Sequence, residues 1–421
     1  MYMKIKLFNS RKDAKTQGLF PLCAFEPLRE FIKLSIITSL FFKLLLLNGC
    51  STEIQPSEKT EKSETVENQD WLLFRGDASL SGYTSTQLPD SPKLLWTYKS
   101  DSRTASSPII CGGIIYWSDK RGRVYGIDYQ GKHCFDYDFK TAVEATPMIY
   151  DSVLYIGRID GFLTALSLTK KDTLWNFETM GQISASPNIA DFEDKKVIVV
   201  GSYDNYLYCL DSRNGKLVKR FLSGYYINGA VALWNEYVIF GGCDSWLRII
   251  NTNTGIQTDS LLLDTYIPAS PAISENDCYV ADCKGNIYHL LINEGKFAKA
   301  KKIFETKGDD GSFVSVPALS ESTLYILSDD KHLYALDRKD GSMKWKFLQK
   351  GDSGESSPVV CFDKVITCTK TGIISILNST DGKLLWEYDT GERITASPAV
   401  INGRFYILTN KGTIFCFGDV H

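Results

Sequence analysis

The chain has 421 residues, of which 43% are hydrophobic and 12% aromatic, and its formal net charge at pH 7 is −3. This apolar content excludes a wholly disordered chain, and the lack of a basic excess argues against a nucleic-acid-binding protein. The length exceeds that of one ordinary hydrophobic core, so the sequence predicts either two domains or one array of repeats.

The first 49 residues predict a signal peptide. Residues 30–49 are mostly apolar, Lys43 interrupts them, and several basic residues precede them. This basic region is unusually long, so the true translation start is expected to lie downstream of Met1. An uncleaved membrane anchor is the alternative, and both interpretations place the rest of the chain outside the cytoplasm.

The signal peptide ends in the sequence LLNGC, which resembles a bacterial lipobox. On that resemblance Leu47 and Gly49 lie at recognition positions of the lipoprotein signal peptidase, and Cys50 is the lipidated first residue. Residues 50–70 follow as a predicted disordered, acidic tether, because 51–70 contain six carboxylates, two lysines and almost no apolar side chain.

From residue 71 onward the sequence repeats with a period of about 40 residues. The recurring feature is a Ser, Thr or Val followed by proline, and the interval between Pro187 and Pro271 spans two periods. Ala230 is expected in the place of the missing proline, which makes eight units. The prolines are Pro108, Pro147, Pro187, Pro271, Pro317, Pro358 and Pro398.

Each unit contains four short apolar runs separated by turns rich in Gly and Asp, as in LYIGRIDGFLTALS at 154–167. Runs of this length joined by tight turns are typical of β-hairpins, and no segment after residue 50 keeps a helical period over three turns. The sequence therefore predicts an all-β chain whose residues 71–421 form an eight-bladed β-propeller of four-stranded antiparallel blades.

The ends of the repeat array indicate how the ring closes. The last unit stops after its third strand, whereas KLLWTYKS at 93–100 is a strand without a unit of its own. It closely matches the fourth strand KLLWEYDT at 383–390. We therefore expect residues 93–100 to complete the last blade and join the two ends of the ring.

Residues that usually carry chemistry are dispersed along the chain. The eleven cysteines include no adjacent pair and no C-x-x-C spacing, and several lie in apolar runs, so we interpret them as buried thiols and leave a disulfide open. The four histidines lie in different units. Five aspartates at the tight turns could surround one face, although turn geometry alone explains them. They are Asp160, Asp204, Asp244, Asp282 and Asp329. The sequence thus predicts no catalytic, cofactor-binding or metal-binding residue and no cofactor.

The turns before the fourth strands carry a family signature. ALDRKDGSMKW at 335–345, ILNSTDGKLLW at 376–386 and ALSLTKKDTLW at 165–175 resemble the A-x-D-x-x-x-G-x-x-x-W turn of quinoprotein-type (PQQ-like) repeats. The segment WLLFRGDASLSGYT at 71–84 is similar to the lead-in of many such propellers. The resemblance implies a propeller whose tryptophans pack between blades: Trp96, Trp175, Trp345 and Trp386.

Three functional classes fit these observations. In fold, length and anchoring the chain resembles the BamB family of outer-membrane assembly lipoproteins, which implies a non-catalytic scaffold that binds another envelope protein. An envelope receptor or sensor for a glycan, a peptide or a small ligand is the alternative. A dehydrogenase that uses pyrroloquinoline quinone is less favoured, because the chain lacks the adjacent cysteines and long insertions of those enzymes.

The stretch 223–237 departs most from the repeat, and such departures are where a functional surface is expected. Tyr225, Tyr226 and Asn228 within this stretch, and Trp246 at the tight turn of the same unit, are therefore the candidate partner or ligand face. Together these interpretations predict a monomeric propeller on the outer membrane of a Gram-negative-type bacterium, on its periplasmic side or at the cell surface, held to the membrane by its lipid.

Overall fold

The computed structural model describes residues 70–306 and 311–420, which belong to the second of two units, 65–421; the first unit is 1–64. The predicted signal peptide, with Leu47, Gly49 and Cys50, and nearly all of the predicted tether lie outside the described residues. All regular elements in the described part of the chain are β-strands, 33 in number. No helix long and apolar enough to cross a membrane was found among the residues that could be searched.

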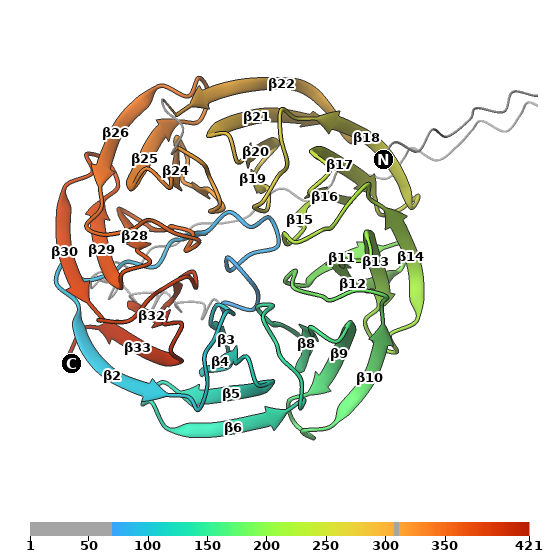
Figure 1. The fold of residues 1–421 in the computed structure, drawn as a ribbon, viewed down its shortest axis with the longest axis horizontal. Helices are drawn as coiled ribbons and strands as arrows, with labels where there is room; N and C mark the ends of the chain where they lie inside the picture. The colour runs from blue at the N-terminus through green and yellow to red at the C-terminus, as the bar shows by residue number, and fades with distance from the viewer. Residues whose placement is uncertain (1–69, 307–310, 421) are drawn as a thin grey trace, which may run out of the picture. The chain divides into compact units, whose positions relative to one another are not determined.

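Eight sheets are arranged in a ring around a common centre, which confirms the predicted eight-bladed propeller (Figure 1). In each blade the first strand lies nearest the centre and the fourth lies at the rim. The strands of the first four blades are β3 (Ile109–Cys111), β4 (Ile114–Ser118), β5 (Arg123–Asp128), β6 (His133–Asp138); β7 (Met148–Tyr150), β8 (Val153–Gly157), β9 (Phe162–Ser167), β10 (Thr173–Glu178); β11 (Asn188–Phe192), β12 (Lys195–Gly201), β13 (Tyr206–Asp211), β14 (Leu217–Leu222); and β15 (Ala232–Trp234), β16 (Tyr237–Gly241), β17 (Trp246–Asn251), β18 (Ile256–Leu262).

Blades 5 to 8 follow the same antiparallel order. Their strands are β19 (Ala272–Ser274), β20 (Asp277–Ala281), β21 (Asn286–Asn293), β22 (Lys296–Glu305); β23 (Ala318–Leu319), β24 (Thr323–Leu327), β25 (His332–Asp337), β26 (Met343–Leu348); β27 (Val359–Cys361), β28 (Lys364–Cys368), β29 (Ile373–Asn378), β30 (Leu384–Asp389); and β31 (Ala399–Ile401), β32 (Arg404–Leu408), β33 (Thr413–Gly418) with β2 (Lys93–Lys99). A further short strand, β1 (Tyr83–Thr84), runs parallel to β27.

Strand β2 closes the ring, as the sequence predicted. It pairs antiparallel with β33, with Lys93 opposite Gly418 and Lys99 opposite Thr413, so the first and last parts of the propeller share blade 8. Because the outer strand of blade 8 comes from the start of the repeat array, the ring cannot open without breaking this ladder.

The sequence placed Ala230 where the repeat lacks its proline, and the structure places the next residue, Val231, there. In the other seven blades the residue after the proline begins the innermost strand, for example Ala272, which pairs with Tyr279. In blade 4 the equivalent pair is Ala232 with Ile239. Val231 therefore takes the place of the proline, and Ala230 takes the place of the Ser or Thr that precedes it.

Tryptophans of the fourth strands join neighbouring blades. The Nε1 of Trp175, Trp345 and Trp96 donates to a backbone carbonyl in the next blade, at 2.9, 3.0 and 2.9 Å respectively. Trp386 differs, because blade 8 has the chain ends where the other blades have this turn. It packs edge-on against Phe405 and Phe417, with ring centroids 5.9 and 5.3 Å away.

The lead-in segment, residues 71–84, runs through the middle of the ring, which we call the central channel (Figure 1). Its backbone exchanges hydrogen bonds with the inner strands of blades 1, 2 and 4 to 7 in chain order, and Asn188 of blade 3 donates to it through its side chain. Arg75 is fully buried and donates to the carbonyls of Pro358 and Pro317, at 2.5 and 3.0 Å. Burial lowers the pKa of Arg75 to about 9.

Candidate functional site on the loop face

One face of the propeller is formed by the loops that lead into each blade and by the turns between second and third strands. We call it the loop face. In seven blades a backbone hydrogen bond of 2.7 to 3.1 Å joins the turn to the neighbouring loop. The donors are Lys120, Ile159, Tyr203, Cys243, Asp329, Lys370 and Asn410. Each bond fixes a turn against the loop that leads into the same blade.

Two of the predicted residues, Tyr225 and Tyr226, belong to an aromatic stack on the loop face. The ring of Tyr226 lies parallel to that of Tyr203 from blade 3, with centroids 4.8 Å apart and an interplanar angle of 7°. The ring of Tyr225 lies 4.3 Å from that of Tyr226. Tyr225 and Tyr226 are 50% and 37% exposed, so the stack presents aromatic surface to solvent.

Trp246, the third predicted residue, begins β17 and pairs with Leu262 at the end of β18. Leu262 is 56% exposed, and Leu222, at the same position of blade 3, is 65% exposed. Five other blades carry a charged side chain at this end of the outer strand: Lys99, Asp138, Glu178, Glu305 and Asp389. Blade 6 has Leu348 there. Blades 3 and 4 thus carry an exposed leucine where five other blades carry a charge, on the same face as the aromatic stack.

Asp244 connects the loop of Tyr225 to the turn that carries Trp246. Its carboxylate accepts hydrogen bonds from the backbone N–H of Gly224, at 2.7 Å, and from Arg248, at 2.5 Å. Although burial opposes ionisation, these bonds hold the pKa of Asp244 below its usual value. The loop and the turn are therefore fixed together, although no ring contact joins Trp246 to the aromatic stack among the described residues.

We define the apolar surface of blades 3 and 4 as the three stacked tyrosines together with Trp246, Leu222 and Leu262. Tyr203, Leu222 and Leu262 were not identified from the sequence. Tyr203 lies in a tight turn, SYDN, that was interpreted only as a turn. Its backbone N–H bonds the loop at Gln182, which leads into its own blade, so its ring contact with Tyr226 of the next loop is evident only from the structure.

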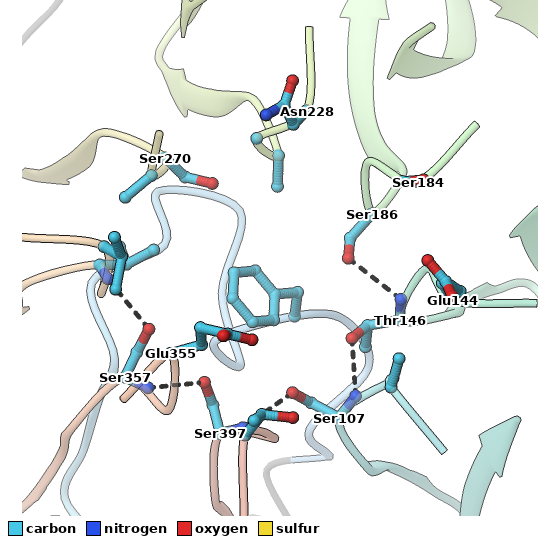
Figure 2. Close-up of a pocket in the computed structure, with 18 of the residues that line it drawn as sticks. Ser107, Glu144, Thr146, Ser184, Ser186, Asn228, Ser270, Glu355, Ser357 and Ser397 are labelled. Atoms are coloured by element: carbon cyan, nitrogen blue, oxygen red, sulfur yellow. Dashed lines mark hydrogen bonds between the residues drawn. The ribbon is translucent and has the colours of Figure 1, made fainter. Parts of the chain in front are cut away.

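Asn228, the fourth predicted residue, lies at the mouth of the central channel (Figure 2). The mouth is a cavity of about 470 Å³ lined by loop residues and by Phe74 of the lead-in segment. The Oδ1 of Asn228 accepts a hydrogen bond from the Cys243 thiol at 3.3 Å. Asn228 therefore belongs to a concave polar site that adjoins the apolar surface through the loop 223–228.

The five turn carboxylates lie on the loop face, and each is bonded within its own turn or to the adjacent loop. The bonding partners are Arg158 for Asp160, Tyr208 for Asp204, Arg248 for Asp244, the N–H of Lys284 for Asp282, and Ser312 for Asp329. Turn bonding accounts for all five. No group of three or more His, Cys, Asp or Glu side chains able to hold a metal was found in the searched part of the chain.

All nine cysteines in the described residues are free thiols, and five of them are buried. Burial raises the pKa of the Cys209 thiol to about 12, which keeps it protonated at neutral pH. Cys134 is the exposed one among the nine.

Comparison with known proteins identifies related sequences and related folds. A curated BamB from Legionella pneumophila is 26% identical over 231 residues, which cover 55% of this chain but only half of that relative. The crystal structure of BamB from Moraxella catarrhalis is similar with a TM-score of 0.67 at 19% identity, covering 78% of this chain and 98% of that one. A quinohemoprotein alcohol dehydrogenase from Comamonas testosteroni has a TM-score of 0.68 at 15% identity, covering 84% and 81%.

Likeness at such identities shows the propeller fold alone, and enzymes and non-enzymes share it. The family assignment rests on the sequence. The family described as outer membrane protein assembly factor BamB matches residues 88–221 and 244–421, which is most of the chain. The unmatched segment 222–243 contains Leu222, Tyr225, Tyr226 and Asn228. The chain therefore belongs to the BamB family of outer membrane protein assembly factors.

Proposed function

We propose that this protein is a non-catalytic, lipid-anchored scaffold of the cell envelope that binds another protein during outer-membrane protein assembly. Membership of the BamB family and the name shared by its curated relatives support this role. The match covers half the length of the Legionella relative, so the partner and the site are inferred from this chain.

The observation that carries the proposal is the apolar surface of blades 3 and 4. A lone exposed leucine needs no explanation, but two leucines, a tryptophan and stacked tyrosines on one face are typical of a protein-binding surface. Since five blades carry a charge where blades 3 and 4 carry leucine, the repeat itself does not require this apolar character. The partner is accordingly a protein with a complementary apolar patch.

The proposed anchor is the lipid on Cys50, with Leu47 and Gly49 as recognition residues of the signal peptidase. Replacing Cys50 by Ala should move the protein from the membrane fraction to the soluble fraction, since one or two acyl chains supply the membrane affinity. Retention of the Cys50→Ala variant in the membrane would contradict the anchor and favour an uncleaved apolar segment.

A non-catalytic role agrees with the absence of adjacent cysteines in the sequence and with the local bonding of every turn carboxylate. A receptor for a small ligand or a peptide is the second candidate, because the mouth of the channel is a cavity with polar groups and an aromatic side chain. The two roles use neighbouring but different parts of the loop face.

Affinity purification of the full-length protein from its own membranes tests the scaffold role. The wild type and the Leu348→Glu control of blade 6 should recover proteins of outer-membrane assembly. Leu262→Glu should lose them, because it places a charge in the apolar surface at the equivalent ladder position. Purification of the wild type without any outer-membrane assembly protein would contradict the proposal. So would recovery of equal amounts of those proteins by the wild type and by the Leu262→Glu variant.

A further inference from the structure

The residues that precede the prolines form a ring of hydrogen bonds around the mouth of the channel (Figure 2). At five joins between blades, the backbone N–H of this residue donates to the hydroxyl of its counterpart in the next blade. The bonds are 2.8 to 3.2 Å long. They run from Ser107 to Thr146, Thr146 to Ser186, Val316 to Ser357, Ser357 to Ser397 and Ser397 to Ser107.

The ring is interrupted over three consecutive joins, from blade 3 to blade 6. Ala230 and Val316 have no hydroxyl to accept a bond, and Ser270 receives none from Ala230. As a result, the backbone N–H groups of Ser186, Ala230 and Ser270 have no hydrogen-bond partner among the described residues. Buried N–H groups are nearly always paired, and Ala230 and Ser270 are 5% and 3% exposed. We call this part of the mouth the ring gap.

Other donors and an apolar side chain line the same cavity as the ring gap. The hydroxyl of Ser270 has no hydrogen-bond partner in the described part of the chain. The side chain of Asn228 accepts a hydrogen bond from Cys243 through its Oδ1, and its amide nitrogen has no partner among the described residues. Phe74 lines the cavity and packs against the hydrophobic clusters of blades 2 to 6. The gap is therefore rich in donors and has an apolar wall.

The charged residues of the mouth come from other blades and are paired. Lys120 and Glu144 form an ion pair of 2.7 Å, and Arg393 lies 3.8 Å from Glu355. No carboxylate is among the lining residues that come from blades 4 to 6. A negatively charged group in the gap would meet donors there, and each of the two carboxylates that line the cavity lies within 4 Å of a basic side chain.

We propose that the ring gap binds a single carboxylate, as carried by an N-acylated amino acid or by the C-terminus of a peptide. A carboxylate oxygen accepts several N–H bonds, and bonds to an ionised acceptor are stronger than neutral ones. The apolar part of the ligand packs on Phe74, and a cavity of about 470 Å³ accommodates one such residue. This site does not depend on the scaffold role, because it needs no residue of the apolar surface.

Two substitutions restore the repeat and thereby test the site. Val316→Thr supplies a hydroxyl of nearly the same shape as valine, placed to accept from Ser270. Ala230→Ser supplies one placed to accept from Ser186. Each variant should keep the fold, because six other blades have a hydroxyl at this position. Each should weaken carboxylate binding at least about tenfold, since one donor to the ligand is lost.

Calorimetric titration of the full protein with N-acetyl-L-phenylalanine and with its amide measures the effect. The acid should bind and the amide should bind at least about tenfold more weakly. Ser107→Ala is the matched control, because it breaks the ring at the join between blades 8 and 1, away from the ring gap, and should leave the affinity for the acid unchanged. Equal binding of acid and amide, no binding of the acid to the wild type, or an unchanged affinity in Val316→Thr would overturn the proposal.

The same titration distinguishes the two sources of the carboxylate. A decapeptide with a free C-terminus should compete with N-acetyl-L-phenylalanine if the site accepts chain ends, and the decapeptide amide should not. Failure of both decapeptides to compete, with binding of the short acid retained, assigns the site to small acids. Binding in the Leu262→Glu variant should equal that of the wild type, which separates this result from a failure of the scaffold role.

Discussion

Replacing Trp345 and Gly382, singly and together, measures how strongly one blade is held to the next. The indole of Trp345 lies against the backbone of Gly382, where an added Cβ would come within 2.6 Å of the ring. Its Nε1 donates to the carbonyl of Ser379 at 3.0 Å, and its ring centroid lies 5.7 Å from that of Tyr325. The contact therefore combines packing, a hydrogen bond and a position where only glycine fits.

The expected cost of each change follows from these contacts. Trp345→Ala should lower the free energy of unfolding by about 3 kcal/mol, the low end of the usual range. The reason is that Trp345 is only partly buried and the carbonyl of Ser379 keeps its 2.9 Å bond from Tyr325. Gly382→Ala should cost about 1–2 kcal/mol for the backbone conformation at φ 72°, and about 1–3 kcal/mol more for the collision with the indole.

In the double variant the collision disappears, because the indole is gone. The sum of the losses of unfolding free energy in the two single variants should therefore exceed the loss in the double variant by about 1–3 kcal/mol. Gly391→Ala is the matched control: its φ is 65°, but an added Cβ meets nothing within 4 Å. Its effect should add to that of Trp345→Ala. Denaturant unfolding of the six proteins measures the free energies, and an additive result for Gly382 within about 0.5 kcal/mol would refute the reasoning.

Three further predictions concern the closure and interior of the propeller. Gly82 has a φ of 62°, and an alanine there would place its Cβ on the guanidinium of Arg75, so Gly82→Ala should lower the free energy of unfolding by about 3 kcal/mol or more. Gly112→Ala is the control, because its Cβ would meet open space, and it should lower the free energy of unfolding by about 1–2 kcal/mol. Equal shifts of the unfolding midpoint in the two variants would contradict the packing of Arg75 against Gly82. Deleting residues 93–99 should remove the outer strand of blade 8 and cause aggregation in light scattering, and a soluble, cooperatively folded deletion variant would contradict closure by β2. A thiol reagent should label Cys134 in the native protein, as read by mass spectrometry, and reaction of a buried thiol before unfolding would contradict the burial of Cys209, Cys278, Cys361, Cys368 and Cys416.

The repeat made the ring predictable because each turn and strand occurs eight times with similar residues. The closing strand was predictable for the same reason, since residues 93–100 match a fourth strand elsewhere in the chain. The assignment of Ala230 to the place of the missing proline was wrong by one residue. The segment NGAV contains no proline, and only the pairing of Ala232 with Ile239 fixes the register of this blade.

The path of the lead-in segment could not be predicted from the sequence. Arg75 bonds to the carbonyls of Pro317 and Pro358, which are 242 and 283 residues away, and backbone carbonyls carry no residue-specific signal. The sequence indicated part of the candidate face, whose role stays a prediction. Tyr225, Tyr226 and Asn228 lie where the repeat departs from its pattern, whereas Leu222 and Leu262 became notable only when the ladder ends of all eight blades were compared.

The central claim, that the loop face of blades 3 and 4 binds a protein of outer-membrane assembly, is tested most directly by photo-crosslinking in intact cells. A photoreactive phenylalanine analogue would replace Trp246, and the same analogue at Leu348 of blade 6 would be the control. A covalent adduct with an outer-membrane assembly protein from position 246, absent from position 348, is the predicted result. No adduct at position 246, or the same adduct from both positions, would contradict the assignment of this face.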